Sequence, residues 1–126
     1  MDNFTDYQTA FIEAYVGAAL WSSTDNKGEP LDNNYSPADI SQESLAVMIL
    51  ECKDFIHSQW AYLSAGLSRR LSANRAGRDF WLTRNHRDAG FWDRGLGSLG
   101  DNLSEAAHSF GSSDLYVGDD DLLHVS

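Results

Sequence analysis

The sequence predicts a single α+β domain: an N-terminal helix, a long central helix, then two β-hairpins with a helix between them. Apolar residues recur at steps of three or four through most of the first 75 residues, as on one face of a helix. Later, short runs of aromatic and β-branched residues alternate with turn formers, which is typical of hairpins. The length of 126 residues suits one domain, 1–126.

The first helix is expected from residue 5 to about residue 21. Thr5 and Gln8 have the spacing of a capping box, and Phe4 is placed as a hydrophobic staple. Apolar residues then share one helical face: Tyr7, Phe11, Ala14, Tyr15 and Ala18. Residues 22–35 are polar and rich in turn formers, which predicts a loop.

The clearest periodic pattern predicts one long helix from about residue 41 to residue 75. Ser36 and Pro37 form a strong helix start, and Ser41 offers a second N-cap. The apolar stripe comprises Leu45, Met48, Ile49, Cys52, Ile56, Trp60, Leu63, Leu67 and Leu71. We expect this stripe to be buried, with Gly66 marking a bend and Gly77 ending the helix.

Two hairpins and a helix are expected in the last third of the chain. The runs 79–84 (DFWLTR) and 91–93 (FWD) flank a turn-like segment and are interpreted as the first hairpin. A helix ending at Gly111 follows, with one apolar face made of Leu99, Leu103, Ala106 and Phe110. Runs 115–117 and 122–125 flank an acidic turn and predict the second hairpin.

The formal charge of −10 is unevenly distributed along the chain. Residues 1–66 carry −8, residues 67–96 hold all seven arginines and carry +4, and residues 97–126 carry −6. If the arginines pair with the acidic segments, ten negative charges still remain. Such a balance disfavours non-specific binding of nucleic acid by the whole surface. No run approaches the ~20 apolar residues of a membrane span, and the first residues do not resemble a signal peptide.

Structural interpretations are favoured for the residues that resemble catalytic or cofactor sites. Cys52 lies on the apolar stripe, where a thiol is inert, and a single cysteine fits a reducing compartment. The four histidines lack zinc-ligand spacing, although His86 and Asp88 are close enough to orient each other. The glycines at 95, 97 and 100 match a dinucleotide fingerprint, but too few residues follow for the required sheet. We therefore expect no enzyme, no cofactor and no metal; the acidic turn 119–121 lacks the rest of a calcium loop.

Aromatic and arginine residues gather in segment 78–94. Many proteins bind single-stranded nucleic acid by stacking its bases on aromatic side chains that lie beside arginines on a small sheet. The alternative, favoured by the negative charge, is that the tryptophans close the core and the arginines pair with acids. The candidates for nucleic-acid contact are Trp81, Arg84, Arg87, Trp92 and Arg94.

Residues 79–85 (DFWLTRN) and 89–97 (AGFWDRGLG) resemble a family of small bacteriophage and prophage proteins. The likeness continues through residues 100–103 and 114–120 (DLYVGDD). The family usually has a glycine-rich turn where this chain has residues 86–88, His-Arg-Asp. The resemblance implies a phage gene product acting in the cytoplasm of the bacterial host, and it supplies no catalytic or binding residue.

The first functional hypothesis is a non-enzymatic, phage-encoded inhibitor of a host anti-phage system, anti-CRISPR or anti-restriction. Its partner would be a host defence nuclease or a CRISPR surveillance protein, which holds nucleic acid in a basic channel. Carboxylates on one face can compete for that channel, in one form as a DNA mimic, without membrane contact or direct nucleic-acid binding. The proposed partner-binding residues are Asp39, Glu43, Glu51, Asp54, Asp119, Asp120 and Asp121. The alternatives are a nucleic-acid-binding accessory protein that uses segment 78–94, and an unrelated role in which acidity serves only solubility.

Overall fold

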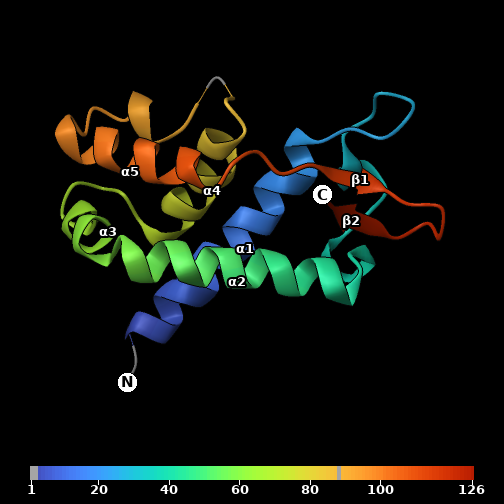
Figure 1. Cartoon of the computed structure of the whole chain (residues 1–126), viewed down its shortest axis with the longest axis horizontal. Coiled ribbons are helices and arrows are strands. Elements are labelled where there is room, and N and C mark those ends of the chain that lie inside the picture. The colour runs from blue at the N-terminus through green and yellow to red at the C-terminus, as the bar shows by residue number, and fades with distance from the viewer. Residues whose placement is uncertain (1–2, 88) are drawn as a thin grey trace.

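The structure is a computed structural model that describes residues 3–87 and 89–126. The described part is mostly helical, with one small antiparallel sheet near the C-terminus (Figure 1). The α-helices are α1 (Asn3–Ser22), α2 (Gln42–Ser58), α3 (Trp60–Leu67), α4 (Ala73–Arg84) and α5 (Ser98–Ser109). The 3-10 helices are η1 (Leu31–Asn33), η2 (Pro37–Asp39) and η3 (Phe91–Asp93), and the strands are β1 (Leu115–Val117) and β2 (Leu123–Val125). Within these residues, no helix is both long enough and apolar enough to cross a membrane.

The core forms where α1, α2 and α4 meet. Gly77 lets α4 approach α1 closely, because a Cβ at this position would collide with the carbonyl group of Phe11. Phe55 of α2 stacks on Phe80 of α4 with ring centroids 4.1 Å apart, and Tyr15 of α1 lies 5.2 Å from Phe80. This aromatic packing joins three helices that are distant in sequence.

The predicted burial of the central stripe is largely confirmed, but the single long helix is wrong. Of the nine stripe residues, five are buried (Met48, Cys52, Ile56, Leu63 and Leu71) and three are partly buried (Leu45, Ile49 and Trp60). Leu67 is 49% exposed, so the expectation is wrong for this residue. The N-cap at Ser41 is confirmed, since its side chain accepts a hydrogen bond from the Ser44 N–H.

The helix breaks at Gln59, whose φ of −110° and ψ of 16° are not helical. The change of direction places Trp60 edge-on against Phe4 and Tyr7 of α1, each with a centroid distance of 5.0 Å. A third helix, α4, begins only at Ala73, after Ser72 has capped it by accepting the Arg75 N–H.

The expected hairpin over residues 79–93 is wrong, because residues 79–84 form the second half of α4. Gly77 consequently lies inside a helix and does not end one. Every residue from Asp79 to Arg84 is buried, and a helix enclosed on nearly all sides shows no apolar stripe. Tertiary packing here overrides the β-propensity of the aromatic and threonine residues.

The remaining expectations are mostly confirmed. The second hairpin is present, with Leu115 paired to Val125 and Val117 to Leu123, and α5 ends before Gly111. The capping box that begins at Ser36 is also present, on η2. The capping box at Thr5 is wrong, since α1 already includes Asn3. The polar loop 22–35 contains η1 and a bridge between residues 24 and 30.

Candidate functional site

Part of segment 78–94, from Asp79 to Arg84, lies in the interior of the protein. Trp81 is 1% exposed, and its indole Nε1 donates a hydrogen bond to Ser22 Oγ at 2.9 Å. Arg84 is 2% exposed. In this structure a ligand outside the protein cannot reach either side chain, so the predicted contact of these two residues with nucleic acid has no support from their positions.

Arg84 binds four groups from three other parts of the chain. Its Nη1 donates to Glu51 Oε1 at 2.7 Å and to the Tyr15 hydroxyl at 2.9 Å, while Nε and Nη2 donate to the carbonyl oxygens of Gly111 and Phe110. Burial by itself would lower the pKa of Arg84, but the interactions with Tyr15 and Glu51 more than offset it, and the pKa is raised. Arg84 is thus a permanent cation that links α1, α2 and the end of α5.

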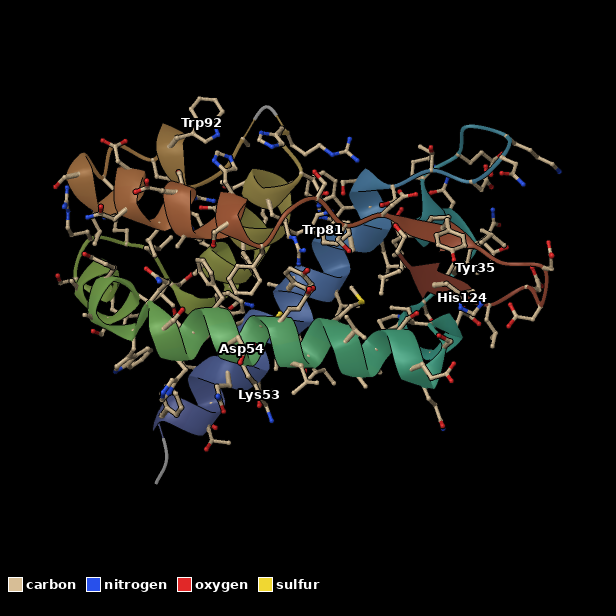
Figure 2. The ribbon with its side chains drawn as sticks, viewed as in Figure 1. Tyr35, Lys53, Asp54, Trp81, Trp92 and His124 are labelled. Carbon is tan, nitrogen blue, oxygen red and sulfur yellow. The ribbon has the colours of Figure 1, made fainter. Side chains whose placement is uncertain are left out.

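The other three candidates in segment 78–94 do not form one surface with these two. Arg94 binds the carboxylate of the fully buried Asp79 with two nitrogens. Arg87 is exposed, and Trp92 is 53% exposed and projects outward from the body of the protein (Figure 2). His86 stacks on His108 at 4.6 Å, and its expected partner, Asp88, lies outside the described residues.

Two acidic segments meet at one end of the molecule. The Ser41 N–H donates to the Leu123 carbonyl at 2.9 Å, and the Tyr35 hydroxyl donates to Asp121 Oδ1 at 3.2 Å. These bonds fasten the loop before α2 to the C-terminal hairpin, at the right of Figure 1. The carboxylates held there, together called the acidic end, are Asp25, Glu29, Asp32, Asp39, Glu43, Asp119, Asp120 and Asp121. Lys27 is the one Lys or Arg residue within the same segments, 25–43 and 119–121, which gives them a formal charge of −7.

Some predicted partner-binding carboxylates of the acidic end are engaged in local bonds. Asp39 accepts the Ser36 N–H at 2.8 Å, as part of the η2 capping box. Asp120 lies 2.9 Å from His124 Nε2, and this hydrogen bond and the one from the Leu122 N–H hold its pKa below the ordinary value. All of these carboxylates remain at least partly exposed.

The predicted carboxylates on α2 lie in two different environments. Glu51 belongs to the Arg84 network and is a structural residue. Glu43, Asp54 and, in the hairpin, Asp119 are exposed, and their carboxylates have no side-chain hydrogen bond or ion pair among the described residues. The structure therefore places Glu51 apart from the other predicted partner-binding residues.

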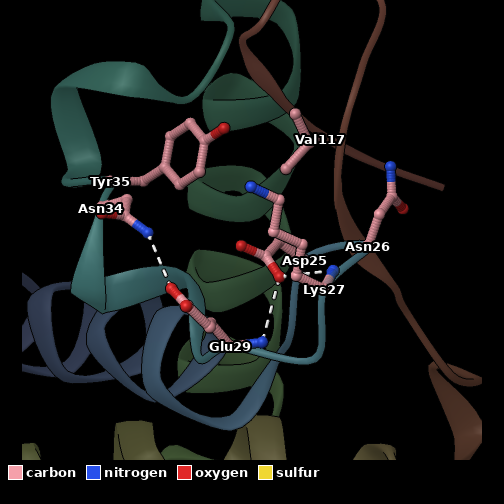
Figure 3. Close-up of a pocket in the computed structure, with 7 residues that line it drawn as sticks. All are labelled: Asp25, Asn26, Lys27, Glu29, Asn34, Tyr35 and Val117. Atoms are coloured by element: carbon pink, nitrogen blue, oxygen red, sulfur yellow. Dashed lines mark hydrogen bonds between the residues drawn. The ribbon is translucent and has the colours of Figure 1, made fainter.

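The loop before α2 contributes acids that the sequence analysis did not select. Asp25 Oδ1 accepts the backbone N–H groups of Lys27 and Glu29, at 2.8 and 3.0 Å, and Glu29 accepts a bond from Asn34 (Figure 3). A shallow hollow of about 320 Å³ lies between this loop and β1. The loop is thus an ordered acidic surface. The composition of residues 22–35 predicts a polar loop but not this ordered structure.

The outward face of α2 adds an apolar patch beside the acids. Val47 is exposed and Leu50 is 62% exposed. Their spacing along the helix places them on the same face as Glu43 and Asp54. An apolar centre between charged residues is the usual composition of a protein–protein interface.

The described residues contain no group of three or more His, Cys, Asp or Glu side chains that could hold a metal ion. The glycines at positions 95 and 97 have φ of 69° and 63° and form the tight connection between η3 and α5. Comparison of the chain with models of known protein families, with curated proteins and with solved structures found no match.

Proposed function

We propose that this protein is a non-enzymatic inhibitor that docks its acidic end onto a basic, nucleic-acid-binding surface of a host anti-phage system. The single observation that carries the proposal is the gathering of eight carboxylates and one lysine on two segments joined by hydrogen bonds. The phage setting comes from the resemblance of residues 79–97, and a CRISPR surveillance protein or a restriction nuclease is the class of target.

The geometry suits competition with a nucleic acid for a basic channel. A scaffold that fixes carboxylates loses little conformational entropy on binding, and a field of one sign accelerates encounter with a surface of the opposite sign. Val47 and Leu50 supply apolar area next to Glu43, so the contact need not depend on charge alone. This favours a protein partner over a free polycation.

The experiment begins with capture of the partner from a bacterial lysate by the tagged protein, followed by titration of the purified pair. The test variant removes three unpaired charges of the acidic end, by Asp32→Asn, Glu43→Gln and Asp119→Asn. The matched control removes three exposed charges from α1 and α5, by Glu13→Gln, Asp101→Asn and Glu105→Gln.

We expect the test variant to weaken binding about tenfold or more and to reduce its salt dependence, while the control changes binding about twofold or less. Both variants should keep the stability of the wild type, because exposed charge changes usually alter it by under about 0.5 kcal/mol each. Equal affinities for the test variant and the control would refute docking by the acidic end.

The alternative hypothesis of nucleic-acid binding through segment 78–94 is weakened, because Trp81 and Arg84 are buried and Arg94 is paired with Asp79. We therefore expect no appreciable binding of DNA or RNA oligonucleotides by the isolated protein at physiological salt.

A further inference from the structure

Five of the seven arginines line a single hollow. Arg69 and Arg70 follow α3, Arg75 and Arg78 lie in the first half of α4, and Arg94 follows η3. With Ala89 they enclose a cavity of about 310 Å³, here called the arginine hollow. In Figure 1 α3 lies at the opposite end of the molecule from the hairpin.

The backbone around the arginine hollow is held in a defined form. The Leu71 N–H donates to the Gly66 carbonyl at 2.9 Å, as in a Schellman motif at the end of a helix. In this motif the residue before the donor has a left-handed backbone. That residue is Arg70, with φ of 69°, where glycine is normally preferred. Arg75 Nη1 donates to the Arg70 carbonyl at 3.3 Å, and Arg69 Nη2 donates to the Gly95 carbonyl at 3.4 Å.

The arginine hollow has a surplus of positive charge. Asp79 neutralises Arg94, but the other four guanidinium groups are exposed, and no carboxylate lines the hollow among the residues that the structure describes. Like charges brought together destabilise the fold unless an anion accompanies them. Guanidinium groups bind phosphate oxygens with two parallel hydrogen bonds, which makes a phosphorylated molecule the best-matched anion.

An apolar groove adjoins the arginine hollow and shares two of its walls. Arg75 and Arg78 also line a second cavity of about 330 Å³, between α1 and α4. Its floor is made of small residues of α1, Ala14, Gly17 and Ala18. Trp21, 44% exposed, borders the groove, and the guanidinium carbon of Arg78 lies 5.7 Å from the centroid of its ring. A planar ring attached to a phosphate can enter this groove.

We propose that the arginine hollow and this groove together bind a nucleotide, with its phosphates on Arg69, Arg70, Arg75 and Arg78 and its base beside Trp21. A small ligand is favoured over a nucleic-acid strand for two reasons. The arginines converge on one cavity and do not follow a track along the surface. The protein carries a formal charge of −10, which repels the phosphates of a long strand that lie outside the cavity. This site uses none of the carboxylates of the acidic end and does not depend on the function proposed for it.

The test is calorimetric titration of the full chain with four probes: ATP, adenosine, inorganic tripolyphosphate and a 12-nucleotide single-stranded DNA. We expect ATP to bind, tripolyphosphate to bind more weakly, and adenosine and the oligonucleotide to show no saturable binding. Equal binding of ATP and tripolyphosphate would overturn the assignment of the base to the groove. Tighter binding of the oligonucleotide than of ATP would overturn the small-ligand proposal.

Variants localise the site. The pair Arg75→Gln and Arg78→Gln should weaken ATP binding about tenfold or more, whereas Arg87→Gln, which removes an exposed arginine outside the hollow, should leave it unchanged. Trp21→Ala should lower the affinity for ATP to that for tripolyphosphate. If the double variant and Arg87→Gln behave alike, the site is not in the arginine hollow.

Arg70→Gly separates binding from folding. Glycine accepts the left-handed backbone of residue 70 without strain, so the variant should unfold at a temperature equal to or above that of the wild type. It should still bind ATP several-fold more weakly, since it lacks one guanidinium group. Unchanged ATP affinity in this folded variant would remove Arg70 from the site. Dimerisation that disappears on Arg75→Gln and Arg78→Gln would show that the acidic end of a second copy fills the hollow, and would overturn the proposal.

Discussion

Replacing Arg84 with methionine removes a buried cation while keeping a side chain of similar length. The side chain is 2% exposed and donates four hydrogen bonds. After the change, water can hydrate three of the four acceptors: the carbonyls of Phe110 and Gly111 and the partly exposed Glu51. The free-energy cost of losing the hydrogen bonds to these three groups is therefore small. The Tyr15 hydroxyl, on a fully buried residue, loses its arginine partner at a cost of about 1–3 kcal/mol. The lost contacts with the rings of Phe80 and Phe110, 5.6 and 5.8 Å from the guanidinium carbon, add about 1 kcal/mol.

Arg84→Met should therefore destabilise the protein by about 3 kcal/mol, which combines the cost at Tyr15 with that of the lost ring contacts. Urea unfolding followed by circular dichroism measures this as a lower midpoint with an unchanged slope. The exposed Arg87→Met is the matched control and should change stability by less than about 0.5 kcal/mol. A loss below about 1 kcal/mol for Arg84→Met would refute the structural role of the network.

Three further predictions concern the core and the hairpin. Gly77→Ala should cost about 3 kcal/mol or more in urea unfolding, because its methyl group meets the carbonyl of Phe11; wild-type stability would contradict the close approach of α1 and α4. Burial raises the pKa of the Cys52 thiol well above its ordinary value. A thiol reagent at pH 8 should therefore react at least about tenfold faster with the urea-unfolded protein than with the folded protein. Equal rates would contradict the burial of Cys52. His124 holds the pKa of Asp120 below 3.8, so the stabilisation from this pair is present above that pH and is lost as the pH falls through the folded-state pKa. In an NMR titration, His124→Ala should raise the pKa of Asp120, and an unchanged value would exclude the pair.

The division of the central helix could not be predicted from the apolar stripe. Gln59 is neither glycine nor proline, and the three-to-four spacing continues from Ile56 to Trp60 and Leu63 across the break. The break is a tertiary effect, since it allows Trp60 to pack against the first turns of α1. The N-cap at Ser41, by contrast, depends only on local residues, and it was predicted correctly.

The helical state of residues 79–84 was missed for a related reason. Periodicity reveals a helix that has one face in water, whereas this segment is covered by α1, α2 and the turn at Phe91. The available sign was Ser72, a helix N-cap residue followed by the good helix formers Ala73, Arg75 and Ala76.

The distribution of charges could be predicted from the sequence, but the ion pairs between them could not. The surplus of acids and the gathering of arginines were visible in the sequence, but their pairing was not. Glu51 and Arg84 are 33 residues apart in the chain, and only the fold brings them together. Likewise, the exposed arginines of the hollow lie before segment 78–94 or at its first residue. Proximity to the tryptophans in the sequence therefore predicted Arg84 as a binding residue and did not predict Arg75.

The acidic end and the arginine hollow are formed by different residues, so one small protein can carry both. At physiological ionic strength the Debye length is about 8 Å, so exposed charges act weakly on groups that lie farther away than this. A bound phosphate therefore responds to its four exposed guanidinium groups more than to the formal charge of −10. It follows that Asp32→Asn, Glu43→Gln and Asp119→Asn together should leave the affinity for ATP unchanged at 0.15 M salt and raise it at about 0.01 M, where the Debye length is about 30 Å. An equal gain in affinity at both salt concentrations would mean that the two charged regions lie close enough to act as one electrostatic site.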